Sequence, residues 1–301
     1  MSTPPPRPGG AGFAFLATLA ALFAFAANSI LCRLALADGS IDPATFTAVR
    51  IASGAVALAA IVALRHGHAA VLRSGDFRSA FALFAYAILF AFAYVVLPAG
   101  TGALLLFGAV QTTMIGAGLM RGERLRSAQS TGVALALGGL VALVAPRLGA
   151  PSFAGALAML GAGVAWGAYS LRGRGTTDPL AATAGNFVRA VPFVVVPVAL
   201  ASAATVAGLI AAGSPLDPHA TARGLALAAI SGAVASGLGY AIWYAALPLL
   251  TATRAGVVQL TVPVIAALGG VLFLGEVVTP RLVACTFAVL GGVALALRRR
   301  G

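Results

Sequence analysis

The stretch SAFALFAYAILFAFAYVVLPAGTGALLLFGAVQTTMIGAGLM, residues 79–120, contains no charged side chain. A helix needs about 20 apolar residues to cross the hydrocarbon core of a bilayer, so this stretch is too long for one crossing. Its middle, LPAGT at 97–101, carries the proline and glycine of a turn. The stretch therefore predicts two membrane-spanning helices joined by a short connection.

The composition of the whole chain extends this prediction. Of the 301 residues, 60% are hydrophobic and only 9% are charged, whereas a soluble domain carries roughly 25% charged residues. This excess excludes an ordinary soluble protein and a disordered one. A membrane β-barrel is excluded as well, because its strands alternate polar and apolar residues and these runs are apolar on both faces. We predict an all-α polytopic membrane protein that has the lipid bilayer as its partner.

Ten membrane-spanning helices are predicted from the apolar runs. The connections between them are too short to hold a soluble domain. A tail rich in proline and glycine, residues 1–11, is expected to be disordered and cytoplasmic. The predicted helices cover residues 12–34, 43–64, 79–97, 101–120, 127–146, 152–171, 180–211, 223–247, 250–274 and 280–297.

The net charge of +12 is explained by membrane topology rather than by nucleic-acid binding. All 19 basic residues are arginines. With ten helices, both termini and four loops share one side, which carries 12 of these arginines, and the other side carries three. Because cytoplasmic loops are enriched in basic residues, both termini are predicted to be cytoplasmic. We expect a multi-pass protein of the bacterial inner membrane that binds no nucleic acid.

The two halves of the chain repeat one another at a spacing of about 150 residues. Each half contains a Gly-Glu pair, a Gly-Gly pair, an Asp-Pro pair before an arginine, and an aromatic residue followed by a small one. These features are, in order, Gly122-Glu123 and Gly275-Glu276, Gly138-Gly139 and Gly291-Gly292, Asp42-Pro43 with Arg50 and Asp178-Pro179 with Arg189, and Phe25-Ala26 and Trp166-Gly167. Five helices per half make the second half enter the membrane from the opposite side. We therefore predict an inverted repeat of residues 12–147 and 148–298, an architecture typical of secondary transporters.

These motifs, which cover about residues 12–298, resemble those of the EamA-type members of the drug/metabolite transporter superfamily. The first half departs from the usual Trp-Gly of the family, with Phe25-Ala26 in its place. The resemblance implies a secondary transporter, not an enzyme, that exports small metabolites by alternating access around a central cavity. Within the family, the chain is most similar to compact amino-acid exporters, including exporters of aromatic amino acids.

All seven acidic residues lie in predicted loops or at the ends of predicted helices. A cationic drug inside the membrane would need a buried carboxylate as its partner. The pattern therefore favours a neutral or zwitterionic substrate such as an amino acid. Coupling of transport to protons stays open, and Glu123 and Glu276 are the carboxylates to consider for it.

Aromatic and amide side chains within the predicted helices are the candidate substrate-binding residues. Aromatic rings stack on the apolar part of a substrate, and amides bind its polar groups without a fixed charge. The alternative is structural, because aromatic residues also form interfacial belts and amides also link neighbouring helices. The candidates are Asn28, Tyr86, Phe90, Tyr94, Gln111, Trp166, Tyr169, Tyr240, Trp243 and Tyr244.

Arg50 and Arg189 occupy corresponding positions in the two halves and have two possible roles. They are either ligands of a substrate carboxylate or structural arginines that reach neighbouring helix ends. Arg50 lies only about 10 Å along its helix from Pro43, at 1.5 Å per residue, and this favours the structural role.

Other functions are weighed against amino-acid export. An organophosphate, nucleotide-sugar or drug exporter of the same superfamily is one alternative, and an integral-membrane enzyme, a channel or a scaffold subunit are others. No cofactor is predicted, and no metal, because His66 and His68 are too few ligands for a metal site. Cys32 and Cys285 are expected to be buried hydrophobic residues. The substrate is a small molecule, and the oligomeric state stays open.

Overall fold

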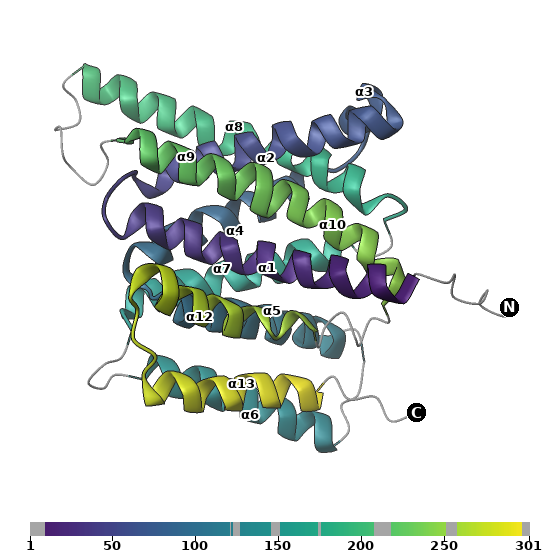
Figure 1. The fold of residues 1–301 in the computed structure, drawn as a ribbon, viewed down its shortest axis with the longest axis vertical. Helices are drawn as coiled ribbons and strands as arrows, with labels where there is room; N and C mark the ends of the chain where they lie inside the picture. The colour runs from purple at the N-terminus through teal and green to yellow at the C-terminus, as the bar shows by residue number, and fades with distance from the viewer. Residues whose placement is uncertain are drawn as a thin grey trace, which may run out of the picture.

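The computed structural model describes residues 10–120, 122, 127–145, 151–173, 176–207, 218–250 and 258–296, which form helices and short connections (Figure 1). The helices are α1 (Gly10–Leu36), α2 (Pro43–His66), α3 (His68–Arg73), α4 (Phe77–Val96), α5 (Ala99–Met120), α6 (Ser127–Val144), α7 (Phe153–Gly173), α8 (Pro179–Val206), α9 (Ala222–Ile230), the π-helix η1 (Ser231–Leu238), α10 (Gly239–Ala246), the 3₁₀-helix η2 (Leu247–Leu249), α12 (Val262–Leu274) and α13 (Pro280–Ala296).

The all-α membrane architecture predicted from the composition is confirmed. Among the described residues, eight helical segments are long and apolar enough to cross a membrane, and α12 and α13 are shorter apolar helices. Most predicted bounds agree with the observed ones within two residues, but the helix predicted over 180–211 ends at Val206. The helix predicted over 250–274 is described only from residue 258. The short helix α3 is absent from the predicted set.

The tail is predicted over residues 1–11, but Gly10 and residue 11 already belong to α1. Residues 1–9 of that tail lie outside the described residues, as do Glu123 and Arg254. Cys32 and Cys285 are buried free thiols, as expected.

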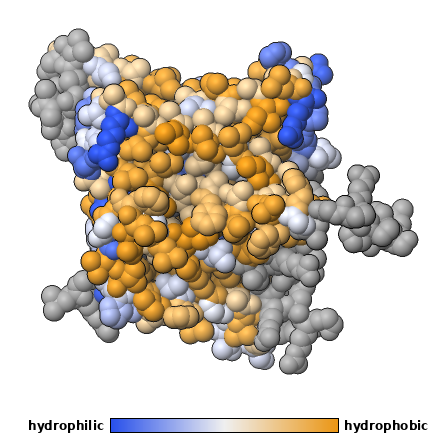
Figure 2. All heavy atoms as spheres, viewed as in Figure 1, coloured by the Kyte–Doolittle hydropathy of each residue, from blue (hydrophilic) through white to orange (hydrophobic). Residues whose placement is uncertain are grey.

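The long helices run side by side in layers, and α1 begins at the same end of the bundle at which α13 ends (Figure 1). Figure 2 shows hydrophilic side chains gathered at the two ends of the helices and hydrophobic ones between them. An apolar middle between polar ends is the distribution that a bundle of membrane-spanning helices requires.

Local capping chemistry explains where several helices begin and end. Asp42 precedes α2 and accepts hydrogen bonds from the backbone N–H groups of Ala44 and Thr45. Gly122 and Gly275, the glycines of the two Gly-Glu pairs, have φ angles of 89° and 65°. Only glycine adopts this left-handed region without strain, so both pairs require glycine for the same reason.

The contacts between helices follow one pattern in the two halves. Corresponding helices of the two halves pack on each other, as α2 does on α8, α5 on α12 and α6 on α13. Other contacts come in matched pairs: α4 packs on α7 as α1 packs on α10, and α5 packs on α7 as α1 packs on α12. Exchanging the halves leaves these pairings unchanged.

One predicted helix contains a π-helical segment, and another contains two prolines. The segment predicted over 223–247 contains the π-helix η1 between α9 and α10. The segment from 180 carries Pro192 and Pro197 inside α8. Proline removes a backbone donor, and π-helical turns are rare and frequently lie at functional sites.

Candidate substrate-binding site

A small cavity lies at the centre of the bundle. It has a volume of about 40 Å³ and is formed by side chains from α1, α4, α5, α7, α10 and residue 259. Five of the predicted site residues line it, together with apolar and polar neighbours. The lining residues are Phe25, Asn28, Ser29, Tyr86, Phe90, Leu106, Phe107, Trp166, Tyr240 and Gln259.

Trp166 of α7 joins the aromatic rings of the cavity into one wall. The centre of its ring lies 4.8 Å from that of Tyr86 and 5.6 Å from that of Tyr240, which it stacks on. Phe25 of α1 adds a ring 5.7 Å from Tyr240. Rings from helices of both halves therefore face one space, and such a wall suits the apolar part of a ligand.

Arg50 lies behind this wall and turns inward rather than toward a helix end. Its side chain is only 3% exposed. Its Nη2 donates to the hydroxyl of Tyr86 at 3.0 Å and its Nε donates to Ser236 Oγ at 3.4 Å. The guanidinium carbon lies 4.9 Å from the centre of the Phe90 ring.

The charge of Arg50 has no carboxylate partner in the described part of the chain. Its Nη1 is buried and has no hydrogen-bond partner there. A buried, unpaired guanidinium is costly, because burial removes its hydration without replacing it. The side chain therefore does not reach a neighbouring helix end, which is the structural role that its position along α2 favours.

Arg189 behaves differently from Arg50, although the two arginines correspond in sequence. Arg189 Nη1 donates to the carbonyl of Ser74 at 2.5 Å and Nη2 donates to the carbonyl of Leu72 at 2.6 Å. These contacts tie α8 to the connection after α3, so Arg189 has the structural role that reaches a helix end.

Asn28 lines the cavity, and two serines hold its amide by hydrogen bonds. Its Oδ1 accepts hydrogen bonds from Ser231 Oγ at 2.8 Å and from Ser236 Oγ at 3.2 Å. All three side chains are buried. Since both serines belong to η1, the π-helix of the second half positions a polar residue of the first half.

The other five predicted site residues lie outside the cavity wall. The Tyr94 hydroxyl donates to the carbonyl of Ala99 at 3.2 Å, which fastens α4 to α5. Trp243 packs with Ala21 and meets the ring of Phe25 edge-on at 5.8 Å, behind the cavity lining. Tyr169 and Tyr244 share Thr183 as a hydrogen-bond partner. Gln111 is buried in α5 but is not among the lining residues.

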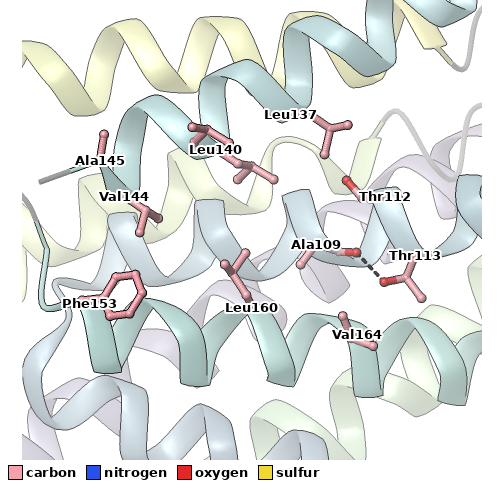
Figure 3. A pocket seen from close by; sticks show the side chains of 11 residues that line it. Ala109, Thr112, Thr113, Leu137, Leu140, Val144, Ala145, Phe153, Leu160 and Val164 are labelled. Atoms are coloured by element: carbon pink, nitrogen blue, oxygen red, sulfur yellow. Dashed lines mark hydrogen bonds between the residues drawn. The ribbon is translucent and has the colours of Figure 1, made fainter.

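A larger groove lies elsewhere, between α5, α6 and α7 (Figure 3). Its volume is about 440 Å³, and leucine, valine, alanine and phenylalanine side chains line most of it. Its two polar residues, Thr112 and Thr113, donate their hydroxyls to the carbonyls of Gly108 and Ala109 in their own helix. With no free polar group to orient a metabolite, this groove is less suited to substrate than the smaller cavity.

Sequence reasoning omits the serines of η1 and leaves Arg50 undecided. Serine is common in membrane helices, and no local pattern marks a π-helical segment. Ser29 and Gln259 also line the cavity without belonging to the predicted set. Across the described residues, no three histidine, cysteine or acidic side chains gather as metal ligands would.

Comparison with known proteins gives three findings. Residues 153–298 match the EamA-like transporter family. The uncharacterized protein PA1977 of Pseudomonas aeruginosa is 54% identical over 285 residues, which cover 95% of this chain and 94% of that protein. A protein of known crystal structure shares the fold, with a TM-score of 0.58 and 23% identity over 92% of this chain and 95% of its own.

Proposed function

Because the chain belongs to the EamA-like transporter family, we propose that it is an inner-membrane secondary transporter that exports amino acids, including aromatic ones. In this proposal, the halves 12–147 and 148–298 form an inverted repeat, and both termini are cytoplasmic. The halves move against each other around the cavity that Trp166 and Tyr240 line. The helix pairings that stay the same when the halves are exchanged, such as α4 with α7 and α1 with α10, support two equivalent moving parts.

The observation that carries the substrate class is the unpaired charge of Arg50. Its buried guanidinium has a free Nη1 and no acidic partner in the described residues. An anionic group that enters the cavity region supplies the missing partner, and a carboxylate matches the planar fork of a guanidinium. The free α-carboxylate of an amino acid has this chemistry.

The rest of the cavity suits the other parts of an amino acid. The rings of Tyr86, Trp166 and Tyr240 lie together on one side. Their π faces attract an ammonium group and stack on an aromatic side chain. A zwitterion can therefore be bound without a membrane-embedded carboxylate.

The same arginines argue against organophosphate export. A phosphate dianion calls for more than one buried cation, yet Arg189 is bound to backbone carbonyls. Arg33 is bound to Glu276 and to the carbonyls of Tyr94 and Val95. Arg50 is thus the one unpaired cation beside the cavity in the described residues, and it favours a monoanionic group.

The size of the cavity supports a cycle between conformations. Pockets that hold small molecules have volumes of about 300–1,000 Å³, and the cavity here has about 40 Å³. Binding of an amino acid therefore requires the walls to separate. Alternating access provides such a separation on one side of the membrane at a time.

The test is uptake of labelled amino acids into proteoliposomes, with and without an imposed pH gradient. We expect saturable uptake of phenylalanine and other amino acids by the wild-type protein, because the cavity binds substrate at a fixed site. Arg50→Gln should lower uptake by about 10- to 100-fold through loss of a charged hydrogen bond.

Arg223→Gln is the matched control, because Arg223 is exposed and pairs with Asp38 at the end of the bundle. It should transport like the wild type. Folded wild-type protein that takes up no amino acid would overturn the proposed substrate, and uptake that does not saturate would indicate a channel.

A further inference from the structure

The π-helix η1 fixes the polarity of the cavity, and we propose that it makes the transporter select a free carboxylate over the corresponding amide. The selection operates through Asn28, whose side chain η1 holds with its NH₂ group toward the cavity. This inference rests on the proposed amino-acid transport and adds the group of the substrate that the site reads.

The contacts of Asn28 assign its orientation. Ser231 Oγ and Ser236 Oγ lie 2.8 and 3.2 Å from the same atom, Asn28 Oδ1. Asn28 lines the cavity, and nothing in the described part of the chain accepts a hydrogen bond from its Nδ2. The carbonyl oxygen is therefore used by η1, and the two N–H donors are left for a ligand.

Arg50 determines the direction of the hydrogen bonds that link it through Ser236 to Asn28. A guanidinium only donates, so Ser236 Oγ accepts from Arg50 Nε, 3.4 Å away. The hydroxyl proton of Ser236 is then free to point at Asn28, and it does so by donating to the carbonyl oxygen Oδ1. A charge on α2 thus fixes an amide on α1 through a serine of η1.

The π-helical geometry is what allows both serines to reach one atom. Residues five apart in an α-helix point about 140° away from each other, at 3.6 residues per turn. In a π-helix, hydrogen bonds join residues five apart, so Ser231 and Ser236 come onto one face. Gly232 lets η1 pack closely on α2, because a Cβ atom there would collide with Ser53 Oγ and the Arg50 carbonyl.

As a result, the polar groups that Asn28 and Arg50 offer on this side of the cavity are hydrogen-bond donors. A carboxylate accepts hydrogen bonds from Asn28 Nδ2 and is attracted by the charge of Arg50, which lies behind the rings of Tyr86 and Phe90. A carboxamide has only one acceptor oxygen, and its NH₂ group faces donors and leaves a buried polar group unpaired. Sites of this kind reject the mismatched analogue strongly, because the unpaired groups are buried.

The experiment measures kcat/KM for phenylalanine and for phenylalaninamide in proteoliposomes. The wild-type protein should prefer phenylalanine by at least about tenfold. The double variant Ser231→Ala, Ser236→Ala frees the Asn28 amide to turn, so the ratio should fall to within about threefold of one while the amide is still transported. Ser202→Ala is the matched control, because Ser202 Oγ donates to the Val198 carbonyl of its own helix, and it should keep the wild-type ratio.

A ratio is used because a merely structural loss lowers transport of both compounds equally. Asn28→Asp gives an independent measurement if the double variant does not fold: an acceptor replaces the donors, so the preference for the carboxylate should be lost. Equal transport of both compounds by the wild type would overturn the inference and leave amino-acid transport standing. A double variant that keeps the wild-type ratio would overturn the role of η1, whereas a wild type that transports neither compound removes the proposed function itself.

Discussion

Arg33 and Glu276, 243 positions apart in the chain, form an ion pair between the two halves, with Arg33 Nε 3.4 Å from Glu276 Oε1. Glu276 also accepts from the backbone N–H of Ala99, the first residue of α5, at 2.8 Å. Arg33 Nη1 donates to the carbonyl of Tyr94 at 3.0 Å. Through this ion pair, α1 is linked to the end of α4, to the start of α5 and to Glu276, which follows the glycine cap of α12.

These contacts predict a structural role for Glu276 rather than a proton-binding one. Glu276→Gln keeps an acceptor for the Ala99 N–H but loses the charge that pairs with Arg33, so it should lower the unfolding free energy by about 1–2 kcal/mol. Glu276→Ala should lower it further, because Ala99 loses its acceptor as well. Thermal unfolding in detergent measures both variants. Glu276→Gln protein that unfolds like the wild type but loses a dependence of uptake on the pH gradient would show instead that Glu276 carries protons.

The corresponding arginines Arg50 and Arg189 should respond in opposite ways to the same substitution. Arg50→Gln removes a buried unpaired charge, so the thermal stability should stay unchanged or rise while transport falls. Arg189→Gln breaks bonds to two backbone carbonyls, so it should lower stability by about 1–3 kcal/mol with transport per folded molecule retained. Unfolding temperature and initial uptake rate, measured on the same preparations, separate the two cases. A parallel loss of stability in both variants would contradict the assignment.

The apolar runs predict the helices well because a bilayer imposes both length and composition on every crossing. The turn at 97–101 separates α4 from α5 as predicted, since Leu97 ends one helix and Ala99 begins the next. The exceptions have local causes. The π-helix η1 packs closely on α2 at Gly232, and a one-dimensional pattern does not contain such a contact.

Side-chain direction is harder to predict than helix position. The distance of Arg50 from the start of α2 gives its depth along the helix but not whether it turns inward, and the inward turn depends on Tyr86 and Ser236 from other helices. Tyr240 and Trp243 are three residues apart in one predicted helix, and both are predicted site residues. Yet Tyr240 lines the cavity, and Trp243 packs with Ala21.

Acid should weaken the capping of α4 by Asp76. Burial raises the pKa of this carboxyl, but hydrogen bonds from the hydroxyl and backbone N–H of Ser79 and from Arg172 outweigh it and lower the pKa to about 2. The folded-state pKa is thus below the unfolded value near 3.8, so the stabilisation is complete above about pH 4 and is lost as the pH falls toward 2.

The measurement is the unfolding temperature of the wild type and of Asp76→Asn as a function of pH. The difference between them should be constant above about pH 4 and shrink below it, and it should be small because the carboxylate is half exposed. A difference that persists unchanged at pH 2 would show that the charge of Asp76 does not contribute.

Membrane orientation is testable at two exposed positions, one in the loop before α2 and one just after α2. Ala37 follows α1 and His68 begins α3, and both residues are exposed. With cytoplasmic termini, Ala37→Cys should react with a membrane-impermeant maleimide in intact spheroplasts, and His68→Cys should react only after lysis. The native thiols Cys32 and Cys285 are buried, so the parent protein serves as the unlabelled control. The reverse labelling pattern would contradict the positive-inside orientation.

The aromatic wall gives the sharpest comparison, because the chain has two tryptophans in different surroundings. Trp166 contacts Tyr86 and stacks on Tyr240 at the cavity, whereas Trp243 does not line the cavity and packs with Ala21 and the outer edge of Phe25. Leucine keeps apolar volume but removes the ring, so Trp166→Leu should lower phenylalanine uptake by about tenfold through loss of stacking and cation–π attraction. Trp243→Leu should lower only the stability, and Tyr240→Leu should follow Trp166→Leu. Uptake rates normalised to folded protein, measured by size-exclusion chromatography, test the comparison. Normal transport by both Trp166→Leu and Tyr240→Leu would rule out an aromatic substrate cavity, while equal losses in the two tryptophan variants would mean that the rings act through packing alone.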